Sequence, residues 1–194
     1  KLLKGAQNVA VGKTRKYVFV NETGDKIESD IDCAIYDMSR NIVLIIEAKW
    51  RTNHYFDEID IAYGRIFRTL INAYSDQIAK HQEFVSRPGS LDFIFEEDTR
   101  YVSPKEMPTI YYIAVDKRNQ MHIEDKHMIS EYMLVYYLKK HIIDENLDLR
   151  EFWDEVSELK TEVKYISSSK EYKEFEIGEY KILVEDGELH LDYL

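Results

Sequence analysis

The sequence predicts a mixed α/β domain in which a central β-sheet is flanked by helices and followed by a small C-terminal extension. Two apolar runs, residues 42–46 and 110–115, are short and rich in Ile and Val, as buried strands are. Between them, residues 54–86 carry apolar side chains at three- and four-residue spacing, the pattern of a long amphipathic helix. The 194 residues suffice for one domain with a sizeable core, so we expect a single domain over residues 1–194.

Three strands are expected before the long helix. Residues 15–20 form the first strand, and the turn-like sequence at 21–24 closes it. Residues 26–37 alternate between polar and apolar side chains and form the second strand. A tight turn at 39–41 leads into the third strand, residues 42–49, so the second and third strands are expected to pair as a hairpin.

The long helix is expected to break near Ser75 and Asp76 and to end at residues 87–90, where Pro and Gly stop it. A loop-rich stretch follows to Pro108. Residues 109–116 then form a buried-looking strand.

Two further helices are expected in the C-terminal third. Residues 130–142 are helical, with cations near the end that suit the helix dipole. Asp148 and Glu151 have the spacing of a capping box, so another helix starts there. We therefore place the core at about residues 15–142 and the extension at about residues 148–194.

A hairpin is expected at the end of the extension. Asp186-Gly187 is a strong signal for a two-residue turn, and it is flanked by the strand-like segments 179–185 and 188–193. The extension is therefore expected to be a helix followed by a β-hairpin.

The charge is acidic overall and basic only near the N-terminus. The net charge is 26 − 37 = −11, which argues against a broad nucleic-acid-binding face. Residues 1–20 contain basic side chains and no acidic one. Two interpretations stay open: this segment is a soluble edge, or it is an arm that contacts phosphates near a site. For the arm, the side chains expected to contact backbone phosphates are Lys13, Arg15 and Lys16, with Arg65 and Arg68 on the helix as the alternative.

The sequence also bears on localisation. Cys33 is the only cysteine, so an internal disulfide is excluded, which fits a reducing cytoplasm. No apolar run approaches the roughly 18–20 residues that cross a bilayer, and no secretory signal peptide is recognised. We expect a cytoplasmic protein that does not enter the membrane.

The segment most informative about function combines two carboxylates with a lysine. If residues 39–40 centre the turn, facing positions of the hairpin sum to 79, which sets Asp32 opposite Glu47 and Asp30 opposite Lys49. Strand alternation places Glu47 and Lys49 on one face. Neighbouring carboxylates repel each other, and a divalent cation such as Mg²⁺ removes that penalty. The pattern therefore indicates a metal site suited to phosphodiester hydrolysis.

These residues resemble the motif of the PD-(D/E)XK, or restriction-endonuclease-like, nuclease superfamily. The resemblance rests on Asp32, a turn, Glu47-Ala48-Lys49 at the end of an apolar strand, and the long helix that follows, and it covers about residues 15–140. It implies a restriction-endonuclease-like core. It also implies that Asp32 and Glu47 hold the metal, that the Ala48 carbonyl adds a ligand, and that Lys49 acts on the attacking water.

The match extends in part to the helix. Gln77 corresponds to a glutamine that some branches carry there, and His81 stands where those branches have an aromatic residue. The sequence departs from the motif at the residue before Asp32, which is Ile31 and not the Pro that gives the motif its first letter. Residues 1–21 hold no acidic residue to match the Glu that some members carry before the first strand.

We therefore expect a Mg²⁺-dependent endodeoxyribonuclease, with Mn²⁺ as a second candidate ion and RNA left open beside DNA as the substrate. A defence or restriction setting is an association with the superfamily. One alternative is a catalytically silent domain of the same fold that binds nucleic acid or a partner protein within a larger machine. In a purely structural alternative, Asp32 and Lys49 form a cross-strand ion pair, Glu47 is solvated, and Gln77 and His81 form a hydrogen-bonded core pair.

Overall fold

The structure, a computed structural model, describes residues 2–49, 59–161, 171–177 and 180–186. It divides the chain into two compact units, Lys1–Lys160 and Thr161–Leu194, where the sequence suggested a single domain.

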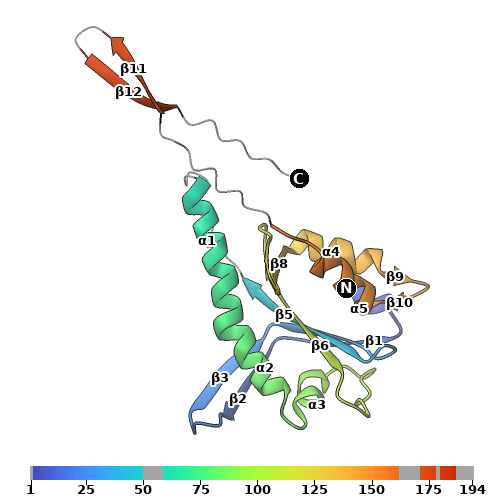
Figure 1. Ribbon diagram of the computed structural model, residues 1–194. Helices are drawn as coiled ribbons and strands as arrows, with labels where there is room; N and C mark the ends of the chain where they lie inside the picture. Colours follow the sequence, from blue (N-terminus) through green and yellow to red (C-terminus); the bar gives the residue numbers. More distant parts are fainter. Residues whose placement is uncertain (1, 50–58, 162–170, 178–179, 187–194) are drawn as a thin grey trace. The chain divides into compact units, whose positions relative to one another are not determined.

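The first unit is built on a six-stranded mixed sheet with the strand order β1-β4-β5-β6-β8-β7 (Figure 1). β5 runs parallel to β6, and β6 runs parallel to β8, whereas the other neighbours are antiparallel. The strands are β1 (Val9–Gly12), β4 (Cys33–Asp37), β5 (Ile42–Lys49), β6 (Thr109–Asp116), β7 (Met121–Ile123) and β8 (Lys126–Ser130). The prediction of a mixed α/β fold with a mixed sheet flanked by helices is confirmed.

The strand predicted over residues 26–37 is wrong as one element. It consists of β3 (Lys26–Ile31) and β4, which are interrupted at Asp32. β3 pairs with β2 (Arg15–Val20) in a separate two-stranded hairpin, while β4 joins the main sheet. The chain therefore changes partners at Asp32, a change that polar and apolar alternation cannot reveal.

The register of the β4–β5 hairpin agrees with the prediction. The pairs run from Asp37 opposite Ile42 to Cys33 opposite Ile46, so that facing positions sum to 79. The buried Asp37 carboxylate fixes the turn, because it accepts hydrogen bonds from the backbone N–H groups of Ser39 at 3.0 Å and Arg40 at 3.3 Å.

The ladder between β4 and β5 ends one residue short of Asp32. Asp30 lies in β3 opposite Lys16, so the predicted pairing of Asp30 with Lys49 is wrong. The reason is again the change of partners at Asp32.

The long helix is continuous but irregular over the described residues. It comprises α1 (Ile59–Asn72), a π-helical segment η2 (Ala73–Ile78) and α2 (Ala79–Val85). The π-helical segment occupies the place where a break was predicted, and such segments are frequent at functional sites. The predicted residues 54–58 lie outside the described residues.

Smaller elements complete the first unit. α3 (Ser90–Phe95) lies in the stretch predicted to be loop-rich. α4 (Glu131–Lys140) starts after Ser130, whose hydroxyl accepts from the Met133 N–H. The remaining short elements are η1 (Leu2–Gly5), β9 (Ile142–Ile143) and β10 (Asn146–Leu147).

The predicted cap at Asp148 is confirmed. α5 (Leu149–Ser157) begins directly after it, and the Asp148 carboxylate accepts from the N–H groups of Arg150 and Glu151. Phe152 and Val156 are fully buried in the core of the first unit, so this helix belongs to that unit rather than to an extension.

The second unit contains a β-hairpin of β11 (Glu171–Ile177) and β12 (Tyr180–Asp186). The predicted strand near 179–185 is thus present, but it pairs with the segment before it and not across Asp186-Gly187. Gly178 and Glu179 separate the paired strands, and a glycine at the first position of a two-residue loop is also a hairpin signal, although a weaker one than Asp-Gly. The segment 188–193 lies outside the described residues.

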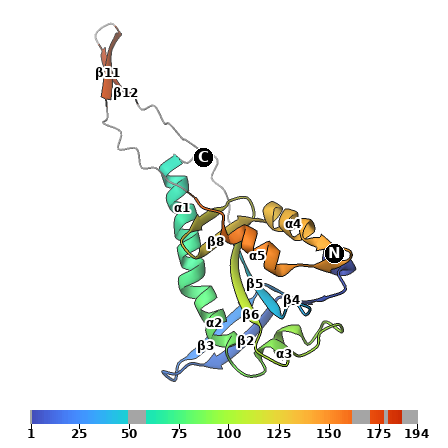
Figure 2. The ribbon, with the colours of Figure 1, turned by 45° about the vertical axis from the view of Figure 1, so that its right-hand side comes forward.

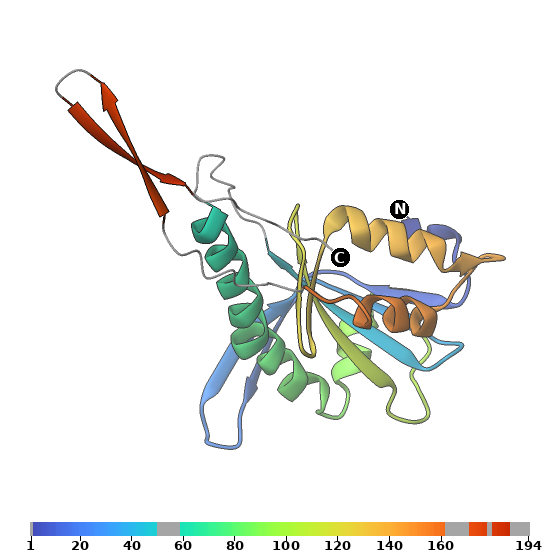
Figure 3. The same ribbon diagram turned by 45° about the horizontal axis from the view of Figure 1, so that its top comes forward.

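The sheet of the first unit is covered on both faces (Figures 2 and 3). Leu44 and Ile46 of β5 pack in one buried cluster with residues of α4 and α5. Val43 and Ile45 pack in another cluster with residues of α2, α3 and the β2–β3 hairpin. Because successive strand residues point to opposite faces, Glu47 follows Val43 and Ile45 toward the face that carries α2.

Candidate functional site

Asp32 lies where β4 and β5 part. Its Oδ2 accepts a hydrogen bond from the Ala48 N–H at 2.7 Å, and the Thr14 hydroxyl donates to the Asp32 carbonyl at 3.0 Å. Ala48 lies two residues beyond Ile46, the last β5 residue that pairs with β4. The Asp32 carboxylate therefore takes the place of a β4 backbone group as the partner of the Ala48 N–H. The N–H and C=O of one strand residue point to the same side of the strand. The Ala48 carbonyl is therefore directed toward the side of β5 on which Asp32 lies.

Glu47 is buried and held through both carboxylate oxygens. Oε1 accepts from the Lys49 Nζ at 2.7 Å, and Oε2 lies 3.0 Å from His81 Nε2. Glu47 is only 6% exposed and His81 is 0% exposed. Two expectations of the structural alternative are therefore wrong, because Glu47 is not solvated and Lys49 pairs with Glu47.

His81 and Gln77 lie one turn apart but bind different partners. The second ring nitrogen of His81, Nδ1, is 2.7 Å from the Tyr17 hydroxyl. Gln77 accepts a hydrogen bond from Ser29 Oγ at 3.0 Å and donates one to Asp76 at 2.9 Å. Gln77 thus lies in the π-helical segment and is tied to the β2–β3 hairpin, rather than paired with His81.

The two carboxylates differ in their electrostatic surroundings. Burial raises the pKa of Asp32, and the negative charge of Glu47 adds to that effect, while the Ala48 N–H and Lys49 oppose it. Burial also disfavours the charged form of Glu47, but the hydrogen bonds from His81 and Lys49 outweigh it and lower the pKa. A cation bound to both groups would favour the ionised form of each.

The donor atoms fit a hard cation. Two carboxylates and a backbone carbonyl are oxygen ligands of the kind that Mg²⁺ accepts, and Mg²⁺ keeps several waters of its own. In the part of the chain that the structure describes, no group of three or more His, Cys, Asp or Glu side chains is arranged to hold a metal. A metal ion here would therefore rely on Asp32, Glu47, the Ala48 carbonyl and water.

The basic N-terminal segment borders this site, but its charges are partly neutralised. Lys13 lies 3.5 Å from Glu97, and Arg15 forms ion pairs with Glu96 and, at 3.7 Å, with Glu97. Residues 1–20 hold no acidic side chain, but Glu96 and Glu97 supply the negative charge that neutralises these two cations. Lys16 is exposed and faces Asp30 across the β2–β3 hairpin.

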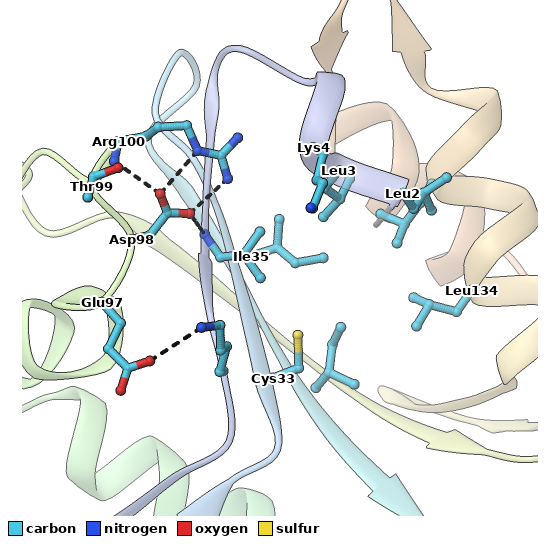
Figure 4. A pocket seen from close by; sticks show the side chains of 14 residues that line it. Leu2, Leu3, Lys4, Cys33, Ile35, Glu97, Asp98, Thr99, Arg100 and Leu134 are labelled. Atoms are coloured by element: carbon cyan, nitrogen blue, oxygen red, sulfur yellow. Dashed lines mark hydrogen bonds and ion pairs between the residues drawn. The ribbon is translucent and has the colours of Figure 1, made fainter.

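A separate pocket of about 460 Å³ lies on the other side of the sheet (Figure 4). Cys33, Ile35 and Leu134 contribute to its apolar lining, and the ion pair of Asp98 with Arg100, 2.8 Å long, lies at its rim. Asp32, Glu47, Ala48 and Lys49 do not line it, whereas Lys13 does.

Sequence reasoning missed the contacts that hold Glu47. Tyr17 carried one usable signal, because it is an inward position in the alternation of β2. That His81 reaches Glu47 depends on how α2 packs over the sheet, and residue spacing does not encode this.

Comparisons with protein-family models, with curated proteins and with solved structures gave no significant match. Within the described ranges, none of the helices combines the length and the apolar character needed to cross a membrane.

Proposed function

We propose that the protein is a Mg²⁺-dependent nuclease that hydrolyses phosphodiester bonds in DNA, with a core of the restriction-endonuclease-like kind. The observation that carries the proposal is that Asp32 and Glu47 meet at the C-terminal end of β5, where Asp32 binds the Ala48 N–H and Glu47 binds the Lys49 amine. The order of elements supports it, since the β4–β5 hairpin is followed by a helix and by β6, which is parallel to β5.

The roles follow from the chemistry of each group. Asp32, Glu47 and the Ala48 carbonyl would hold the metal, which when bound lowers the pKa of its water and polarises a phosphoryl oxygen. The Lys49 amine is fixed on Glu47 and partly exposed, so it is suited to orient the attacking water and to offset negative charge on the phosphate. The resemblance would give Gln77 a role in orienting that water, although its side chain binds Ser29 and Asp76 in the structure.

DNA contact would fall to the basic segment beside the site. Thr14 touches Asp32, so its neighbours Lys13 and Arg15, with Lys16, are close enough in sequence to meet phosphates near the carboxylates. A protein with a net charge of −11 needs such local basic groups to hold a polyanion. RNA carries the same phosphodiester linkage, so the test includes it.

The test is cleavage of plasmid DNA, linear DNA and RNA, each with Mg²⁺ and with a chelator. We expect cleavage of DNA that the chelator abolishes. Asp32→Ala and Glu47→Ala should abolish cleavage and weaken metal binding, whereas Lys49→Ala should abolish cleavage and leave metal binding largely intact. Matched controls are Asp154→Ala and Lys105→Ala, two exposed residues outside the site. Cleavage by Lys49→Ala at the wild-type rate would contradict the role given to this lysine.

One observation favours the catalytically silent alternative. Both oxygens of Glu47 are already bound by the side chains of Lys49 and His81, so this carboxylate has partners without a metal. In that case the domain would bind nucleic acid or a partner protein without cleaving it. A calorimetric titration with Mg²⁺ and Mn²⁺ separates the two, because the silent domain would show no binding that depends on Asp32.

A further inference from the structure

A chain of hydrogen bonds leads from the candidate site into the core. It runs from Lys49 to Glu47, then to His81 and to Tyr17. His81 is 0% exposed and Tyr17 is 3% exposed, so neither side chain can replace its partner with water. Each member is therefore held by the next, and the position of the Glu47 carboxylate depends on the whole chain.

The chemistry of the groups gives each bond a direction. An ionised carboxylate can only accept, so His81 Nε2 donates to Glu47 Oε2. If the ring is neutral, its other nitrogen is an acceptor and the Tyr17 hydroxyl donates to His81 Nδ1, whereas a protonated ring donates from Nδ1 to the hydroxyl oxygen. The Tyr17 hydroxyl thus supports the ring orientation in which Nε2 faces Glu47.

Tyr17 is itself fixed by packing. Its ring stacks on Phe84 with a centroid distance of 4.0 Å and an interplanar angle of 9°, and it also contacts Phe19. Tyr17 stands opposite Ser29 in the β2–β3 hairpin, and Ser29 donates to Gln77. The β2–β3 hairpin therefore contacts both Gln77, through Ser29, and His81, through Tyr17.

We infer that His81 and Tyr17 are positioning residues that fix the orientation of the Glu47 carboxylate for metal binding. This inference rests on the proposed function, because it concerns the same site. His81 binds one oxygen of Glu47. This bond prevents the Glu47 carboxylate from rotating away from Asp32 and Ala48. Partners that orient a ligating group change metal affinity or activity by about 10–100-fold when they are removed.

The decisive comparison is between His81→Gln and His81→Asn. The amide nitrogen of Gln can reach the place of Nε2 and donate to Glu47, whereas the shorter Asn reaches only the place of Nδ1. We expect His81→Asn to weaken Mg²⁺ and Mn²⁺ binding by about 10–100-fold, and His81→Gln to regain much of that loss. A merely structural role would affect the two variants alike, and thermal unfolding of each variant shows whether the fold is kept.

Tyr17→Phe tests the next link with less disturbance, since only a hydroxyl is lost. Its metal affinity should also fall, and cleavage should recover when the Mg²⁺ concentration is raised, with the KM for DNA unchanged. The matched control is Tyr36→Phe, a buried tyrosine of the same apolar cluster that hydrogen-bonds to Asn41, and it should keep wild-type metal affinity.

The outcomes separate the inference from the proposed function. If the wild-type chain binds metal and cleaves DNA, but Tyr17→Phe and His81→Asn have wild-type metal affinity, the inference alone is overturned. Equal losses in His81→Gln and His81→Asn would overturn it too. A wild-type chain that binds no divalent cation and cleaves nothing would overturn the proposed function and the inference together.

Discussion

The Asp32 carboxylate accepts a hydrogen bond from the Ala48 N–H at 2.7 Å, in the place where a continuing β4 would have provided a strand partner. This contact links the end of one strand to the end of the next. It brings the Asp32 side chain to the C-terminal end of β5, which also carries Glu47 and Lys49. This contact is the geometric basis of the proposed metal site.

The first prediction concerns the stability of the metal-free protein. Asp32→Asn should leave the free energy of unfolding at pH 7 unchanged or slightly raised, because the raised pKa of Asp32 means that its ionised form is disfavoured in the fold. Any stability that this group contributes is present below its unfolded pKa and is lost as the pH rises through its folded pKa. Urea unfolding measures the effect, with Asp154→Asn as the control.

Glu47→Gln should have the opposite sign. The pKa of Glu47 is lowered, so its stabilising contribution is present above the unfolded pKa and is lost as the pH falls through the folded pKa. Removing this charge between Lys49 and His81 should cost about 1–3 kcal/mol at pH 7. Equal changes in Glu47→Gln and Asp32→Asn would show that the two carboxylates do not differ as described.

A third prediction concerns the buried histidine pair of β7 and β8. His122 and His127 face each other across the hairpin, and burial lowers the pKa of His122 from 6.5 to about 4. The stability due to neutral His122 is therefore fully present above pH 6.5 and should be lost as the pH falls toward 4. Urea unfolding of the wild type between pH 7 and pH 4 should show this loss, and His122→Gln should show a flatter dependence. A variant with the wild-type slope would contradict the assignment.

A fourth prediction concerns Tyr74 in the π-helical segment. Its hydroxyl lies 3.0 Å from the Tyr112 carbonyl and accepts from the His127 N–H at 2.9 Å, so it bridges β6 and β8 just before their ladder starts at Ala114. Tyr74→Phe should lower the free energy of unfolding by about 1–3 kcal/mol, because buried backbone groups lose a partner. A change below about 0.5 kcal/mol, the usual range of surface substitutions, would mean that this bridge does not stabilise the sheet.

A fifth prediction concerns DNA binding by the basic segment. The double variant Glu96→Gln, Glu97→Gln should release Lys13 and Arg15 from their ion pairs and raise the affinity for duplex DNA. The dependence on salt should become steeper by roughly 0.9 for each additional phosphate that the released side chains neutralise. Fluorescence anisotropy at several salt concentrations measures both quantities.

The control for that experiment is the same pair of substitutions combined with Lys13→Ala, Arg15→Ala and Lys16→Ala. If the added alanine substitutions leave the affinity and the salt dependence equal to those of the Glu96→Gln, Glu97→Gln variant, the segment is a solvent-exposed part of the surface without a role in binding. Other basic residues would then contact the phosphates.

Much of the site could be predicted because it depends on local pairing. The aliphatic run before Glu47 defined β5 at both ends, and the turn after Asp37 fixed the register that brings Asp32 next to the end of β5, where it binds the Ala48 N–H. The interruption at Asp32 could not be predicted, since β3 and β4 share one alternating pattern while they belong to different sheets.

The contacts of His81 and the short strands were beyond the sequence for different reasons. The bond from His81 to Glu47 joins residues 34 positions apart through the packing of a helix on a sheet. β1 and β7 have only four and three residues, too few for a periodic pattern to stand out. In the second unit, both Gly178-Glu179 and Asp186-Gly187 are sequence signals for a hairpin turn. The pairing of β11 with β12 shows that the strands on either side of Gly178-Glu179 form the hairpin.

The most direct test of the central claim is anomalous diffraction from crystals of the wild-type protein soaked in MnCl₂. We expect an anomalous peak from a Mn²⁺ ion that is bound by the carboxylates of Asp32 and Glu47 and by the Ala48 carbonyl. Lys49 should lie beside the ion, and waters should fill its remaining coordination positions. A Mn²⁺ ion bound elsewhere, or an Asp32–Glu47 site still without metal at saturating MnCl₂, would contradict the account.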